Sequence, residues 1–142
     1  MYKGLENWQA AFYGKVDDKN LTDKSDMVFT TLSEITGVFD GPDSAGPAMY
    51  MLTNKKALYG AAYIFDSEVV NGIYNKIGAF YAFPSSIHEV IVYAYKKREK
   101  STDEYMVNMV KEVNDTTVDE RDQLSFEVLY FDGNEFESVG GT

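Results

Sequence analysis

The sequence predicts an α+β fold, a mostly antiparallel sheet of five to six strands with two covering helices and an N-terminal helical segment. Apolar residues recur at three- and four-residue spacing before Pro47 and at two-residue spacing after it. Gly133-Asn134 separates two apolar runs, which is a strong hairpin signal. Aromatic residues make up 15% of the chain and are typical of strands. Together these observations favour a sheet after Pro47 and helices before it.

The N-terminal segment is predicted to be helical. Helical apolar spacing runs over 4–16 and again over 25–39. A cluster of glycine, proline and aspartate then separates this segment from the rest. We therefore expect one domain over 1–142, with a helical segment over 1–45 packed outside a sheet-containing core over 46–142.

The core is predicted to alternate strands with two helices. Strands are expected over 48–53, 60–65, 79–83, 87–95 and on both sides of Gly133, and helices over 66–77 and 101–113. Asp66 and Ser101 are candidate N-caps, Ser101 in a capping box, and Gly78 is placed to end the first helix. A turn is expected over 84–86. The run 87–95 is apolar on both faces, which predicts a central strand.

The composition excludes several classes of site. The chain has no cysteine, so it forms no disulfide, thiolate metal site or cysteine nucleophile. No apolar run approaches the roughly 20 residues of a membrane-spanning helix, and no signal-peptide pattern begins the chain, so we expect a cytoplasmic protein. The sequence carries neither a phosphate-binding glycine loop nor a calcium loop. We therefore expect no cofactor and no metal.

Charge is distributed unevenly along the chain. The formal net charge is −10, and residues 101–142 hold eleven acidic and two basic residues. Such a segment repels nucleic acid and anionic membranes and attracts basic surfaces. The sequence thus predicts that these carboxylates bind a basic partner, although the same charges also serve solubility. The predicted partner-binding residues are Asp103, Glu104, Glu112, Asp115, Asp119, Glu120, Asp122, Glu127, Asp132, Glu135 and Glu137.

The only histidine lies in a run of residues that could carry chemistry. The candidate catalytic or ligand-binding residues are Ser85, Ser86, His88, Glu89 and Asn54. Neighbours in a strand point to opposite faces, so His88 and Glu89 are not expected to touch. No second histidine and no Gly-x-Ser-x-Gly elbow supports a nucleophile. We therefore favour a structural role, in which a serine bonds a turn amide and His88 is hydrogen-bonded at the start of a strand.

Three stretches of the chain, 49–65, 79–95 and 109–132, resemble a domain-of-unknown-function family of gut-dwelling Gram-positive bacteria and their mobile elements. The shared motifs are Leu52-Thr53-Asn54, Gly60-Ala61, the run from Pro84 to Val90, Val113-Asn114, Leu124-Ser125 and Tyr130. The resemblance is to the C-terminal part of that family. It implies a related fold and a mobile-element setting, but no reaction.

Three hypotheses about function follow. The favoured hypothesis is a non-catalytic acidic inhibitor, borne by a phage or mobile element, that imitates nucleic acid in the basic channel of a host defence complex, as an anti-CRISPR protein would. Its expected aromatic anchors are Tyr105, Phe126, Tyr130, Phe131 and Phe136. The alternatives are a small-ligand-binding or hydrolytic module centred on the 84–89 motif and a bacterial interaction protein of another kind.

Overall fold

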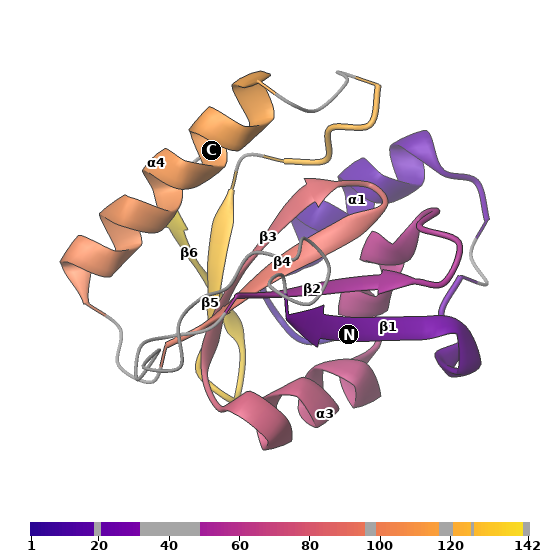
Figure 1. The fold of residues 1–142 in the computed structure, drawn as a ribbon, viewed down its shortest axis with the longest axis horizontal. Coiled ribbons are helices and arrows are strands. Elements are labelled where there is room, and N and C mark those ends of the chain that lie inside the picture. Colours follow the sequence, from indigo (N-terminus) through magenta and orange to yellow (C-terminus); the bar gives the residue numbers. More distant parts are fainter. Residues whose placement is uncertain (19–20, 32–48, 96–98, 117–120, 126, 141–142) are drawn as a thin grey trace.

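The fold is described by a computed structural model, shown in Figure 1. The described residues are 1–18, 21–31, 49–95, 99–116, 121–125 and 127–140, without the side chains of 113–116. The predicted turn cluster after residue 39 and the predicted anchor Phe126 lie outside them.

Six strands form one sheet in which every neighbouring pair is antiparallel, in the order β1-β2-β4-β3-β5-β6. The strands are β1 (Met27–Thr31), β2 (Met49–Asn54), β3 (Phe80–Ser86), β4 (Glu89–Ala94), β5 (Val128–Phe131) and β6 (Phe136–Gly140). The helices are α1 (Glu6–Lys15), α3 (Ser67–Ile77) and α4 (Lys100–Thr116), with 3-10 helices η1 (Lys24–Asp26) and η2 (Gly60–Phe65). The predicted α+β fold with an antiparallel sheet is confirmed.

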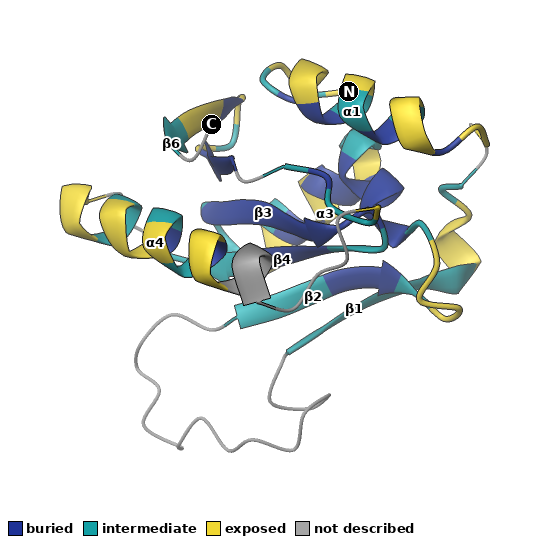
Figure 2. Ribbon diagram, turned by 90° about the horizontal axis from the view of Figure 1, so that it is seen from above, coloured by how far each residue is buried: buried dark blue, intermediate teal, exposed yellow. Residues whose placement is uncertain are grey.

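Helices cover both faces of the sheet. On one face, α1, η2 and α3 share a buried apolar cluster with the sheet, and on the other face α4 does. Figure 2 shows the buried strand β3 and the largely buried strand β4 in the middle of the fold, and the less buried strand β1 at the edge of the sheet. Alternation along β3 explains the division, because Phe80 and Ala82 belong to the first cluster and Tyr81 and Phe83 to the second. Strand β4 lies between β2 and β3, so its predicted central position is also confirmed.

Local sequence signals determine several boundaries as predicted. The side chain of Asp66 accepts the Glu68 backbone N–H at 2.9 Å and caps α3. Gly78 follows α3 with φ +80°, a conformation that favours glycine. Gly133, at φ +103°, lies in the turn between β5 and β6. Asp66 acts through a local side-chain cap and the two glycines through their own backbone conformation, which is why sequence inspection finds all three.

The N-terminal segment differs from the prediction. The expected helix over 25–39 is wrong for Met27–Thr31, which form the edge strand β1. The sequence of β1, MVFTT, is rich in β-branched and aromatic residues, and pairing with β2 decides its conformation. The helix α1 is confirmed, but Trp8 and Phe12 are fully buried in the core. This segment therefore contributes a helix and a strand to the fold instead of packing outside it.

Two predictions in the core are also wrong. Residues 60–65 form η2 instead of a strand, because a short and fully apolar run does not distinguish a buried helix from a strand. Strand β3 continues through the predicted turn at 84–86, with an irregularity between Pro84 and Ser86. The helix α4 begins one residue before Ser101, so Ser101 is not its N-cap.

Candidate functional site

His88 lies in the tight turn that connects β3 to β4, not inside a strand. The Ser86 hydroxyl accepts the His88 backbone N–H at 3.0 Å. The neighbouring Ile87 N–H donates to the Asp122 carbonyl at 2.8 Å. The expectation that a serine bonds a turn amide here is confirmed.

Both ring nitrogens of His88 face specific groups. Nδ1 accepts the Tyr59 backbone N–H at 3.0 Å, and the two rings stack with centroids 5.4 Å apart. Nε2 lies 3.6 Å from the Asp122 carboxylate. Because Nδ1 is an acceptor, the neutral ring carries its proton on Nε2, toward Asp122. The ring thus connects the loop that contains Tyr59 to the loop that contains Asp122. Because the side chain is only 25% exposed, it offers little surface to a substrate.

The turn rests on the segment that follows β2. Thr53 Oγ1 donates to the His88 carbonyl at 2.8 Å. A Cβ built on Gly60 would lie 2.6 Å from that carbonyl oxygen, which explains the glycine by close backbone approach. Asn54 closes the 54–58 loop by donating to the Leu58 carbonyl and accepting the Leu58 N–H.

We call this arrangement the His88 lock; its members are Thr53, Asn54, Tyr59, Gly60, Ser86 and His88. Hydrogen bonds to main-chain atoms hold the β3–β4 turn, which contains His88, against the segment from Thr53 to Tyr59.

Ser85 and Glu89 form a separate pair. The Ser85 hydroxyl donates to the Glu89 carboxylate at 2.7 Å, and Ser85 is 6% exposed. The five candidate residues are thus distributed over three hydrogen-bonded groups: Asn54 with its loop, Ser85 with Glu89, and Ser86 with His88. The structure does not bring them together as a nucleophile, a base and an orienting acid.

The acidic residues of the last third do not form a uniform surface. Exposed carboxylates lie on α4 and on the β5–β6 hairpin, at Glu104, Glu112, Asp132, Glu135 and Glu137. Asp103 and Asp122 are half-buried, whereas Glu127 is buried at 7% exposure and is not available to a partner. The Asp115 side chain and residues 119–120 lie outside the described part of the chain.

Several of these carboxylates have roles within the fold. Asp132 accepts the backbone N–H groups of Asn134 and Glu135, and these bonds lower the pKa of its carboxyl group. Asp103 accepts the hydroxyl of the buried Tyr81 at 2.5 Å. Removal of either side chain would therefore disturb structure as well as charge.

The expected aromatic anchors divide in the same way. Tyr105 on α4 is 56% exposed. Tyr130, Phe131 and Phe136 are buried at 7%, 0% and 4% exposure, so their prediction as surface anchors is wrong. Strands β5 and β6 turn these side chains into the two apolar clusters, which makes them core residues.

Sequence reasoning missed Tyr59, whose backbone binds His88. Tyr59 has a φ of +59°, and a tyrosine gives no sequence signal for that left-handed conformation. It also missed a groove between β1 and α3, where Gly72 leaves open space on the helix. A glycine inside a predicted helix was the one available signal, since glycine weakens helices.

Within the described residues, no helix has the length and apolar character needed to cross a membrane. The same residues hold no group of three or more histidine and carboxylate side chains arranged for a metal ion.

Comparison with known proteins places the chain by sequence. A model described as a family of unknown function (DUF5688) matches residues 12–133. No curated protein and no solved structure matches the chain. The matched range contains the whole His88 lock, the helix α4 and strand β5. The chain therefore belongs to the family of unknown function DUF5688.

Proposed function

We propose that this protein is a non-catalytic acidic binding protein, carried by a phage or another mobile element, that inhibits a host nucleic-acid-handling defence complex. One observation supports it most: exposed carboxylates occupy two adjoining elements, α4 and the β5–β6 hairpin, beside the exposed ring of Tyr105. We call this surface the acidic face; its members are Glu104, Tyr105, Glu112 and Glu137.

The geometry of α4 and β6 supports a continuous acidic face. Val107 of α4 contacts the end of β6, where a Cβ on Gly140 would lie 3.0 Å from it. Val139 packs in the apolar cluster that α4 covers. Glu137 is two residues earlier in the strand, so its side chain points to the same side of the sheet. Glu104 of the helix and Glu137 of the hairpin therefore lie on the same side of the sheet.

The chemistry of the acidic face suits a basic channel. Complexes that handle nucleic acid hold the phosphate backbone in positively charged grooves. Carboxylates can take the place of phosphates there, and exposed charges act over a Debye length of about 8 Å at physiological salt. Tyr105 adds a large aromatic ring, a residue type that often dominates interface energies.

The His88 lock supports a binding role over a catalytic one. Its polar atoms bond one another and the main chain. The Ser85 hydroxyl is likewise bonded to Glu89. No contact in this region favours a hydrolytic site, so we propose no second function.

The test is inhibition of DNA cleavage by purified CRISPR effector–guide complexes of Gram-positive bacteria. The parent protein should inhibit at least one complex, and inhibition should weaken as salt rises. The double variant Glu104→Lys/Glu137→Lys should inhibit at least tenfold less well.

The matched control is Asp17→Lys/Asp18→Lys, which changes net charge equally at exposed positions after α1, a helix on the other face of the sheet. The proposal fails if the parent inhibits none of the complexes. It also fails if the two double variants behave alike, because net charge rather than the acidic face would then explain binding.

A further inference from the structure

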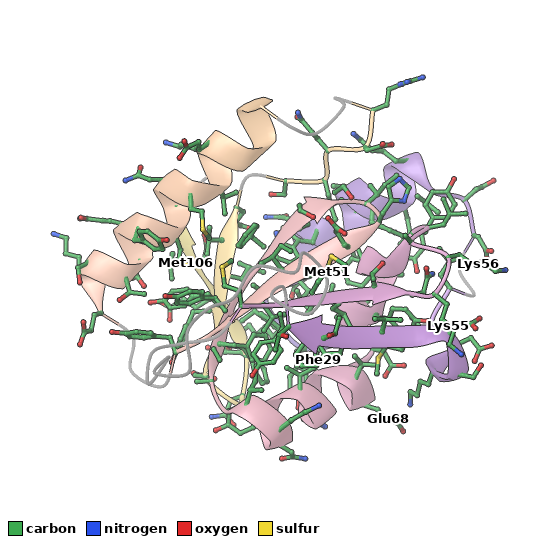
Figure 3. All side chains as sticks on the ribbon, in the orientation of Figure 1. Phe29, Met51, Lys55, Lys56, Glu68 and Met106 are labelled. Carbon is green, nitrogen blue, oxygen red and sulfur yellow. The ribbon has the colours of Figure 1, made fainter. Side chains whose placement is uncertain are left out.

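A groove of about 570 Å³ lies between the edge strand β1 and the helix α3. Its apolar lining comes from Met27 and Phe29 of the strand and from Val69 and Ile73 of the helix. Figure 3 shows Phe29 on β1 and Glu68 on α3 at this side of the molecule. A Cβ built on Gly72 would meet nothing within 4 Å, so the absence of a side chain there keeps the groove open.

Some backbone groups of β1 point outward from the sheet, beside this groove. The Asp26 carbonyl accepts the Lys55 N–H at 2.9 Å, and the same register pairs Val28 with Thr53. In an antiparallel ladder, hydrogen-bonded and non-bonded pairs alternate. Asp26 and Val28 thus stand in hydrogen-bonded pairs, and Phe29, the next residue, stands in a non-bonded pair, so its backbone N–H and C=O point away from β2.

The edge strand is also unguarded by its sequence. Strand β1 reads MVFTT and contains neither proline nor a charged residue. Natural sheets commonly protect an edge with lysine, proline or an irregularity, because open edges attract further strands. An apolar edge strand beside an open groove suits a site where an extended segment of a partner pairs with the sheet as a further strand.

Charge distinguishes the two ends of the groove. At one end, Lys24 bonds the Glu68 carboxylate and lies 4.0 Å from Asp66. At the other end, the Lys76 ammonium lies 5.9 Å from the centroid of the Phe29 ring. Among the described residues no carboxylate pairs with Lys76, so a ligand carboxylate can reach it.

We infer that this groove binds an extended segment of a partner protein, which adds to the edge of β1 as an antiparallel strand. Alternate apolar side chains of the segment enter the groove, and an acidic residue near its N-terminal end pairs with Lys76. Main-chain bonding to Phe29 favours a peptide over a small apolar ligand. A second copy of this chain is disfavoured because each copy carries a net charge of −10.

The test is selection from a randomised hexapeptide library with the full chain as bait, followed by fluorescence anisotropy. Selected peptides should share an acidic residue followed by alternating apolar residues. The variant Gly72→Leu should bind them at least tenfold more weakly, since leucine fills the groove. Leucine favours helix over glycine, so the variant should remain folded.

Two further variants sharpen the result. Gly14→Leu is the matched control, because Gly14 also lies in a helix with nothing near its Cβ, and it should bind like the parent. Lys76→Glu should reverse the preference from acidic to basic residues. Hydrogen exchange of the Phe29 amide should slow when a selected peptide binds.

Several outcomes would overturn the inference. These are a selection that enriches no sequence over an empty matrix, equal binding by Gly72→Leu, or an unchanged Phe29 amide. Dimerisation of the parent that is lost in Gly72→Leu would assign the edge to a second copy instead. The groove and the acidic face lie on opposite sides of the sheet, so failure here is distinguishable from failure of the proposed function.

Discussion

The His88 lock and the acidic face use similar polar residues in opposite ways. In the lock, side-chain atoms of Thr53 and His88 bond the main chain of distant segments, and Asn54 bonds the main chain of its own loop. On the acidic face, Glu104 and Glu137 are exposed. The sequence motif around His88 therefore has a structural role, whereas the acidic residues of the last third provide the candidate binding surface.

The difference has an energetic reason. A buried donor or acceptor that loses its partner costs about 1–3 kcal/mol. Exposed charges change stability by only about 0.5 kcal/mol or less. Substitutions in the lock should therefore reduce stability, whereas substitutions on the acidic face should affect binding alone.

The largest expected effect is that of Gly60→Ala. The added Cβ would lie 2.6 Å from the His88 carbonyl oxygen and 2.7 Å from the Thr53 Cα, so backbone must move. We expect a loss of about 3 kcal/mol in the free energy of unfolding, measured by urea denaturation. Gly14→Ala, in open space on α1, should instead be neutral or stabilising. Equal effects of the two variants would mean that Gly60 is not needed for close approach.

Replacement of His88 should have the next largest effect. His88→Leu removes the acceptor of the Tyr59 N–H and should cost about 1–3 kcal/mol. His88→Asn keeps an acceptor near the position of Nδ1 and should recover part of that loss. His88→Gln places its amide nearer the position of Nε2 and should recover less. A variant that stays folded but abolishes a measurable turnover would instead make the motif catalytic.

A smaller effect is expected for Asp132→Ala in the hairpin turn. Hydrogen bonds from Asn134 and Glu135 lower the pKa of Asp132 in the folded protein. The stabilisation is thus present above the unfolded pKa of about 3.9 and is lost as pH falls through the lower folded value. The variant should lose about 1 kcal/mol at pH 7. Its stability should then fall less steeply than that of the parent below about pH 4, and parallel pH profiles would refute this role.

The smallest effect on stability is expected for Glu104→Lys/Glu137→Lys. Both side chains are exposed, so the free energy of unfolding should change by about 0.5 kcal/mol or less. Thermal denaturation at two salt concentrations measures it. A large destabilisation would mean that these carboxylates, like Asp103 and Asp132, have a role within the fold.

The candidate site was only partly predictable from the sequence. The structural role of Ser86 and His88 could be predicted, because the sequence has a single histidine and no nucleophile motif to accompany it. The burial of Glu127 and Phe131 was not accessible, because the acid-rich, aromatic run in which both stand does not show which residues the sheet turns inward. Burial depends on which face of the sheet is covered. Helix α4 covers one face, and α1, η2 and α3 cover the other.

The sequence by itself determined the charge distribution, the absence of cysteine chemistry, the helix α3 with its Asp66 cap and Gly78 end, and the hairpin at Gly133. Each depends on the residues present or on local backbone geometry. Only the tertiary structure decided three other features: Met27–Thr31 form the edge strand, Gly60–Phe65 form a 3-10 helix, and the Tyr59 backbone N–H donates to His88. These arrangements depend on contacts between segments far apart in the chain, which outweigh the small local preferences that a sequence displays.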